Sequence, residues 1–381
     1  MAKKKSAISL TSEQKEMLEN ALKKEKPVEF IETGNVGLDL ALTDGKGLPM
    51  GSSTLLWAKP GCGKTTVVTD ASRRLILKHK AKGEVFKVLF LAVEDSRELM
   101  ESLGMGELME SKDFIYIPQR FCWRQIETFY DAVLGGYGPY EGVKLIIIDS
   151  INNVLSDQNI KNSAADGDYG TKARERSGFY GKYLPLCKEQ GISSFFISQV
   201  RQKQGATQFE DPNKAAVSNV DLHNVDIILK CSSSLNATDA TRIEEKTIFG
   251  TDKVDSKRIF KMDSKATDCK NRYIRGNAVE LLFEKGKCVH NYYTVRKLLE
   301  GNGLLTSHAA GYWSFCPELC ETFGLPTTKM RGVAKCNELI QEHIGDFINY
   351  LKEAGMYKVS LSATEVPFDE DEIEEDEGTE E

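Results

Sequence analysis

Apolar residues along this chain gather in short runs that are separated by longer amphipathic stretches. The strongest runs are Thr54–Trp57, Val85–Val93, Leu145–Ile148, Ser194–Ser198 and Val225–Lys230. Short apolar runs that alternate with helical stretches are typical of a parallel sheet covered by helices on both faces. The pattern therefore predicts an α/β core over residues 33–288, built on a mostly parallel, twisted sheet.

A short amphipathic helix and linker are predicted over residues 1–32. Thr11 can cap this helix, and Gln14 completes a capping box. The apolar face carries Met17, Leu18, Ala21 and Leu22. One helix cannot bury this face within itself, so we expect it to pack on the core or on another subunit.

The region after the core predicts a small α/β domain over residues 289–360. A helix is expected at Tyr292–Glu300, a turn at 301–303 and a further helix at Glu338–Ala354.

Composition favours a cytoplasmic protein. Hydrophobic residues are 40% and charged residues 28% of the chain, which is a soluble globular profile. No apolar run reaches the ~18 residues of a membrane span. Nine cysteines fit a reducing compartment, and Cys316 and Cys320 lack the partners of a zinc site.

The negative charge is concentrated at the C-terminal end, where residues 361–381 predict a disordered acidic tail. Residues 365–381 carry 11 acidic side chains and no basic one, which leaves 46 acidic against 50 basic residues elsewhere. A body of net charge +4 with an acidic tail favours a polyanion-binding surface for which the tail competes. The alternative is a tail that only improves solubility.

A phosphate-binding loop follows the first strong apolar run. Glycines in a strand–turn–helix context let backbone N–H groups surround an anion at a helix N-terminus. Lys64 is expected to reach the β- and γ-phosphates of ATP, and the Thr65 hydroxyl to hold Mg²⁺. Ala58 takes the place of the usual first glycine. The predicted nucleotide-binding residues of the loop are Lys59, Pro60, Gly61, Cys62, Gly63, Lys64, Thr65 and Thr66.

Three further polar residues end predicted core strands. Asp149 follows Leu145–Ile148 and is expected to hold the same Mg²⁺, usually through water. Glu94 is the candidate for orienting or deprotonating the attacking water, with an ordinary surface carboxylate as the alternative. Gln199 is a candidate sensor of the γ-phosphate, with a simple strand-end amide as the alternative.

Two long segments follow core strands, near residues 156–171 and 201–219. Ligands of open α/β sheets bind at the carboxyl ends of the strands, and loops of this length are usually functional or disordered. The second segment carries Arg201 and Lys203.

These motifs, in this order, resemble the bacterial RecA recombinases and their phage-encoded relatives. The similarity runs from about Glu32 to Phe315. It includes Glu32-Thr33-Gly34, the phosphate loop, Val93-Glu94, Ile148-Asp149-Ser150, Gly167-Asp168, Phe196-Ile197-Ser198-Gln199 and Gly311-Tyr312-Trp313. The resemblance implies that residues 156–171 and 201–219 are DNA-binding loops. It also implies that Arg174, Arg201 and Lys203 contact DNA, that the N-terminal helix packs on a neighbouring subunit, and that Lys265 reaches the neighbour's ATP.

The chain departs from the family pattern at several positions. Asp263 stands where the family has a second lysine, with Lys261 nearby, which bears on ATP-coupled assembly. Gln204 replaces an apolar residue that the family inserts between base triplets, and Ala215-Ala216 replaces two glycines. The tyrosine that stacks on adenine in the family is missing.

We interpret the chain as a DNA-dependent ATPase that forms a helical homo-oligomeric filament on single-stranded DNA. It would promote pairing and strand exchange with homologous duplex DNA, with ATP and Mg²⁺ as cofactors and no membrane partner. One alternative is a ring-forming helicase motor, which would need an oligomerisation domain larger than the predicted N-terminal region. The other is an ATP-binding filamentous or regulatory DNA-binding protein that lacks strand exchange.

Overall fold

The computed structural model describes residues 11–12, 15, 27–94, 97–157, 171–202, 213–215, 219–234, 241–247, 250–266, 269–284 and 289–357. The apolar face of the predicted N-terminal helix, Lys203, Gln204 and the acidic tail lie outside these residues, as do most of the two predicted DNA-binding segments.

The helices alternate with strands along the core. The α-helices are α2 (Val36–Thr43), α3 (Lys64–Ala81), α4 (Arg97–Ser102), α5 (Gly106–Glu110), α6 (Trp123–Leu134), α7 (Thr171–Gln190), α8 (Asn219–Asn224), α9 (Asn291–Gly301), α10 (Pro317–Phe323), α11 (Val333–Glu342) and α12 (Ile344–Glu353). The 3₁₀ helices are η1 (Gly138–Tyr140), η2 (Ile151–Asn153) and η3 (Ala309–Gly311).

The strands of the core are β1 (Phe30–Ile31), β2 (Leu48–Pro49), β3 (Ser53–Ala58), β4 (Lys87–Ala92), β5 (Phe114–Pro118), β6 (Val143–Asp149), β7 (Ser193–Gln202), β8 (Asn213–Ala215), β9 (Ile227–Ser234), β10 (Thr241–Thr247), β11 (Gly250–Asp263), β12 (Lys270–Asn271), β13 (Ala278–Glu284) and β14 (Val289–His290). They range from two residues in β1 to 14 in β11, and β3, β4 and β6 are almost wholly buried. The region after the core strands contributes β15 (Leu305–His308), β16 (Tyr312–Phe315) and β17 (Met330–Arg331).

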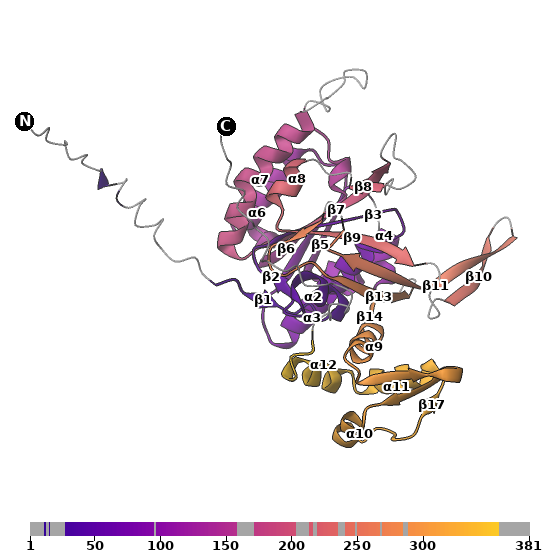
Figure 1. The fold of residues 1–381 in the computed structure, drawn as a ribbon. Coiled ribbons are helices and arrows are strands. Elements are labelled where there is room, and N and C mark those ends of the chain that lie inside the picture. The colour runs from indigo at the N-terminus through magenta and orange to yellow at the C-terminus, as the bar shows by residue number, and fades with distance from the viewer. Residues whose placement is uncertain are drawn as a thin grey trace, which may run out of the picture.

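One large sheet forms the centre of the molecule, with the order β14-β13-β11-β9-β3-β7-β6-β4-β5 (Figure 1). Within the described residues, the run from β9 to β5 is parallel throughout, whereas β11, β13 and β14 join it in antiparallel pairs. All five predicted apolar runs lie in the parallel part, so the predicted α/β class is confirmed. β10 and the outer part of β11 form a two-stranded ribbon that projects from the body (Figure 1).

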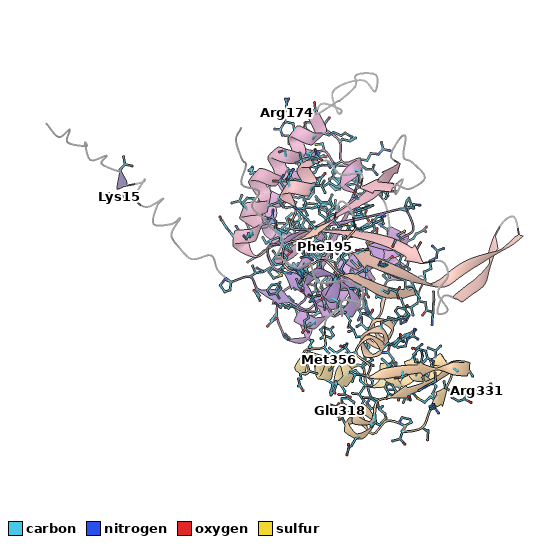
Figure 2. All side chains as sticks on the ribbon, viewed as in Figure 1. Lys15, Arg174, Phe195, Glu318, Arg331 and Met356 are labelled. Atoms are coloured by element: carbon cyan, nitrogen blue, oxygen red, sulfur yellow. The ribbon has the colours of Figure 1, made fainter. Side chains whose placement is uncertain are left out.

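Side chains of the central strands pack alternately into two layers of helices. Leu56 of β3 lies in a buried cluster with α3 residues such as Val68, whereas Trp57 lies in the cluster that contains Phe179 of α7. Phe195 of β7 lies in the middle of the sheet (Figure 2). Burial on both faces explains why these strands are continuous apolar runs rather than alternating ones.

The register of the parallel strands brings their carboxyl ends to one edge of the sheet. Ala58 of β3 pairs with Gln199 of β7, and Ala92 of β4 pairs with Asp149 of β6. Polar groups that are far apart in the sequence therefore meet at this edge, where open α/β sheets bind their ligands.

A second, three-stranded sheet, β15-β16-β17, packs with α10, α11 and α12 below the main body (Figure 1). β14 pairs with β13, so the main sheet extends to His290, two residues beyond the predicted boundary at residue 288. In addition, α9 contributes Val295 and Leu299 to the same buried cluster as Leu281 of β13.

The prediction of one helix over Glu338–Ala354 is wrong. The structure has two helices, α11 and α12, which meet at His343 with backbone angles φ −104° and ψ 22°. The buried positions Ile340 and Phe347 are seven residues apart, a spacing that one continuous helix would also show. The apolar pattern therefore could not reveal the break.

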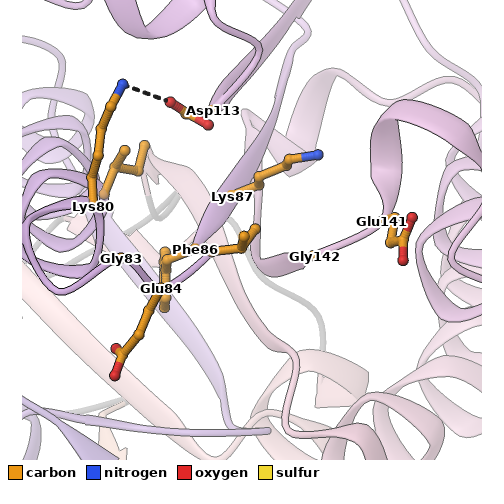
Figure 3. Close-up of a pocket in the computed structure, with 10 residues that line it drawn as sticks. Lys80, Gly83, Glu84, Phe86, Lys87, Asp113, Glu141 and Gly142 are labelled. Atoms are coloured by element: carbon orange, nitrogen blue, oxygen red, sulfur yellow. Dashed lines mark hydrogen bonds and ion pairs between the residues drawn. The ribbon is translucent and has the colours of Figure 1, made fainter.

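A cavity of about 540 Å³ opens at the opposite edge of the sheet (Figure 3). It is lined by residues that precede or begin β4, β5 and β6, among them Lys87, Asp113 and Gly142. An ion pair of 3.3 Å joins Lys80 and Asp113 beside it. Because the cavity lies at the amino ends of the strands, it is separate from the edge that carries the predicted catalytic residues.

Candidate active site

The predicted phosphate loop connects β3 to α3, as the strand–turn–helix interpretation requires. Gly61 and Gly63 have φ values of +75° and +70°, which side chains other than glycine rarely adopt. A Cβ atom on Gly63 would also come within 3.1 Å of the Phe283 ring. The loop therefore needs glycine at both positions, as do loops whose backbone N–H groups surround an anion.

Lys64 is the first residue of α3, and its side chain turns back to the phosphate loop. Its side chain is only 8% exposed, and Nζ donates hydrogen bonds to the carbonyl oxygens of Ala58 (3.1 Å) and Lys59 (3.0 Å). Burial lowers the pKa of the ammonium group, while the neighbouring Cys231, Asp149, Cys62 and Glu94 oppose that shift. The loop thus holds a cation at the position where the phosphates of a nucleotide would enter.

Thr65 and Asp149 meet directly next to Lys64. The Thr65 hydroxyl donates to Oδ2 of Asp149 at 2.5 Å, and Asp149 is 6% exposed. The pKa of Asp149 is raised to about 6, mainly because the carboxyl group is buried; Glu94 contributes to this rise, and Thr65 and Lys64 oppose it. A bound divalent cation would favour the charged carboxylate.

These two oxygen ligands fit Mg²⁺, which takes one or two protein oxygens and completes its shell with phosphate and water. Across the part of the chain that the structure describes, no group of three or more His, Cys, Asp or Glu side chains is placed to hold a metal ion. A cation at Thr65 and Asp149 would thus depend on a nucleotide for the rest of its ligands.

Glu94 follows β4 and lies at the same edge. One carboxylate oxygen, Oε1, accepts hydrogen bonds from Ser150 Oγ (3.2 Å), Asn153 Nδ2 (2.5 Å) and Gln199 Nε2 (2.9 Å). The Glu94 side chain is exposed, so its second oxygen can reach a water molecule. The structure therefore brings Glu94 and Gln199 together across 105 residues of sequence.

Two residues that the sequence analysis did not identify hold this arrangement. Asn153 binds Glu94, and Asn152 Oδ1 accepts from Ser198 Oγ (2.8 Å) and from the Gln199 backbone N–H (3.1 Å). Both belong to η2, directly after the strand that ends in Asp149. Two consecutive amides after a core strand were the signal that could have identified them.

The remaining predicted residues lie elsewhere. Arg174 is exposed in the first turn of α7, at the outer end of that helix (Figure 2). Arg201 belongs to β7, and Lys203 lies outside the described residues. Lys265 is exposed just after β11, and three strands lie between β11 and β6 in the sheet.

The Asp263 carboxylate forms hydrogen bonds and an ion pair with residues close to it in the sequence. Its Oδ1 accepts from the backbone N–H groups of Lys265 (2.8 Å) and Ala266 (3.2 Å), and its Oδ2 lies 3.4 Å from Lys261 Nζ. The residue that departs from the family pattern therefore holds the turn that carries Lys265.

None of the helices formed by the described residues is both long and apolar enough to cross a bilayer.

Comparison with known proteins agrees with this geometry. A family model described as an AAA domain matches residues 43–201, a range that includes the phosphate loop, Glu94, Asp149 and Gln199. The protein named RecA of a Nitratiruptor species is 25% identical over 194 residues, 51% of this chain and 52% of that protein. RecA of Campylobacter jejuni subsp. doylei is 27% identical over 198 residues, 52% of this chain and 53% of that protein.

A eukaryotic relative is similar over a comparable stretch. The mitochondrial DNA repair protein recA homolog of Dictyostelium discoideum is 27% identical over 192 residues, 50% of this chain and 39% of that protein. The chain spans about half the length of the two bacterial relatives it matches. Together with the fold and the site, these similarities support a RecA-like P-loop ATPase family for this chain.

Proposed function

We propose that the chain is a DNA-dependent ATPase that forms a filament on single-stranded DNA and promotes homologous pairing and strand exchange. The observation that carries this proposal is the 2.9 Å hydrogen bond from Gln199 Nε2 to Glu94 Oε1. Gln199 lies two residues before the predicted DNA-binding segment 201–219. A change at the γ-phosphate that displaces Gln199 would therefore reach that segment through β7.

Hydrolysis on this site uses the groups at the carboxyl edge of the sheet. The loop N–H groups and Lys64 bind the phosphates of ATP. Thr65 and Asp149 would hold Mg²⁺, which would neutralise phosphate charge when bound. Glu94 orients the attacking water and accepts its proton. The water oxygen bonds to the γ-phosphorus as the bond to the ADP oxygen breaks, and ADP and phosphate are released.

The position of Lys265 supports self-assembly with ATP between subunits. Because β9, β3 and β7 lie between its strand and β6, Lys265 is on the flank of the sheet away from Glu94. On that flank it can reach the nucleotide of a neighbouring copy, as the family resemblance implies. The turn fixed by Asp263 keeps the Lys265 backbone in place for this contact.

We also propose that the protein acts in the cytoplasm, without a membrane partner.

DNA binding should be directed to the phosphate backbone. Arg201→Ala and Lys203→Ala are each expected to weaken single-strand binding for all sequences, because each removes a cation that neutralises a phosphate. The slope of log affinity against log salt should decrease by about 0.7 for each lost contact. Fluorescence anisotropy over a salt series measures both effects, with Arg174→Ala as a third test position.

Lys82→Ala is the matched control for these variants, because Lys82 is an exposed cation at the amino edge of the sheet. It should leave the slope unchanged. Unchanged slopes in all three test variants would place the DNA site away from residues 174–203.

The second candidate function is a filamentous regulatory protein without strand exchange. It is favoured by Asp263, which pairs with Lys261 where the family pattern has another lysine. Both candidates predict filaments on circular single-stranded DNA with a non-hydrolysable ATP analogue, seen by electron microscopy. They differ in one assay, the transfer of a strand from homologous linear duplex to the circle. Joint molecules support the recombinase, and filaments without joint molecules support the regulator.

A further inference from the structure

A buried polar cluster lies behind the active site, between α7 and α8. Arg176 is 7% exposed and Asp221 is fully buried. Arg176 Nη1 donates to Asp221 Oδ2 at 2.8 Å, and the Tyr180 hydroxyl donates to Asp221 Oδ1 at 2.6 Å. Both oxygens of this buried carboxylate are therefore hydrogen-bonded.

The same arginine is also connected to the active site. Arg176 Nη2 donates to the backbone carbonyl of Ile151 at 3.3 Å. Ile151 begins η2, whose next two residues, Asn152 and Asn153, bind Gln199 and Glu94. A continuous path of hydrogen bonds and one turn of backbone therefore runs from Glu94 through η2 to Asp221.

The two helices of this cluster begin where the predicted DNA-binding segments end. α7 begins at Thr171, the last residue of the segment 156–171, and α8 begins at Asn219, the last residue of the segment 201–219. Arg176 and Asp221 are both within the first two turns of their helices. The ion pair thus joins the downstream ends of both segments to each other and to η2.

Stability alone is a weak reason for such a pair. Apolar side chains of similar volume often stabilise a core as well as a buried ion pair does, because both charges must be desolvated. A planar guanidinium with two directed hydrogen bonds, lying 5.6 Å from the Trp123 ring centre, instead fixes the relative position of three elements. An ion pair that fixes α7, α8 and η2 relative to one another is suited to transmit a movement of one of these elements to the other two.

We propose that Arg176 and Asp221 couple the nucleotide site to both DNA-binding segments, so that the affinity for single-stranded DNA depends on which nucleotide is bound. This inference rests on the proposed function. A nucleotide that changes the contacts of Glu94 and Gln199 displaces η2. Arg176 then transmits the displacement to α7 directly and to α8 through Asp221. Both side chains are buried and bonded to protein groups, so Arg176 and Asp221 would act as positioning residues.

The test compares single-strand affinity with a non-hydrolysable ATP analogue and with ADP. For the wild type, the ratio of the two affinities should fall in the range of about 5–150 that is usual for coupled sites. The double variant Arg176→Met/Asp221→Leu keeps the volume buried and removes the directed contacts. Its ratio should fall to within about twofold of one, the value for uncoupled sites. Affinity for a fluorescent nucleotide without DNA should change less than about twofold, since no nucleotide contact is removed.

Asp70→Asn is the matched control. Asp70 is a buried carboxylate on α3 that pairs with Arg74 at 2.8 Å, and its side-chain hydrogen bonds within the described residues go to Asn35 and Arg74 rather than to η2, α7 or α8. Breaking this pair should cost stability and leave the affinity ratio at the wild-type value. Arg176→Lys is a second test variant, because it retains charge but loses the two-pronged geometry. It should also lower the ratio several-fold, and it decides the question if the double variant does not fold.

The outcomes separate the inference from the proposed function. A wild-type ratio that persists in the double variant, or in Arg176→Lys if the double variant does not fold, overturns the coupling role alone. A wild-type protein that binds no single-stranded DNA with either nucleotide overturns the proposed function as well. An equal loss of the ratio in Asp70→Asn would mean that general destabilisation is the cause, and would also overturn the inference.

Discussion

Glu94→Gln is expected to slow ATP hydrolysis by a factor of about 10²–10⁴, the usual contribution of a positioned general base. Glutamine has the same shape, and its amide oxygen can still accept from Ser150, Asn153 and Gln199. The amide cannot take a proton from water, so the substitution should slow only the chemical step of hydrolysis. Nucleotide affinity should stay within about twofold of wild type, since Glu94 is not assigned to phosphate binding.

Single-turnover hydrolysis and binding of a fluorescent nucleotide measure these two quantities separately. Glu98→Gln is the matched control, because Glu98 is an exposed glutamate four residues along the chain. It should hydrolyse ATP at the wild-type rate. Normal hydrolysis by the Glu94 variant would show that another group orients the water.

Lys64→Ala should weaken ATP binding by a factor of about 10² or more. Hydrogen bonds to charged groups contribute about 1.5–3 kcal/mol each, and the ammonium group can reach two phosphates. The substitution also leaves the carbonyl oxygens of Ala58 and Lys59 without this donor, so thermal unfolding must show that the variant is folded.

Lys59→Ala separates this effect from a general loss of positive charge in the loop. The Lys59 side chain is exposed, and exposed charges contribute at most about 1 kcal/mol, or roughly fivefold in affinity. Isothermal titration with ATP and Mg²⁺ compares the two variants. An equal, small loss in both would contradict the assignment of Lys64 as the phosphate cation.

Much of the core could be predicted because its strands are buried on both faces. The run Leu145–Ile148 must be apolar at every position, and it ends in a polar residue only where the sheet reaches its ligand edge. The same rule located Asp149, Glu94 and Gln199, which the parallel register then brings to one edge.

Side-chain partners from distant elements could not be predicted in this way. The Arg176–Asp221 pair depends on how α7 packs against α8. Neither the apolar periodicity of the sequence nor a local motif indicates that packing. The role of Asn153 depends on the turn of η2 after Asp149. Asp263 is a related case. The sequence shows only that it stands where the family pattern has a lysine, whereas the structure shows that its carboxylate accepts hydrogen bonds from the backbone N–H groups of Lys265 and Ala266.

Steady-state ATP turnover of the wild-type chain tests whether hydrolysis at Glu94 depends on DNA, as we propose. The rate is measured at saturating ATP and Mg²⁺, with and without circular single-stranded DNA. We predict that DNA raises the rate by about tenfold or more, the size of coupling expected between linked sites. Equal rates with and without DNA, under conditions where the protein demonstrably binds the circular DNA, would contradict DNA-dependent hydrolysis.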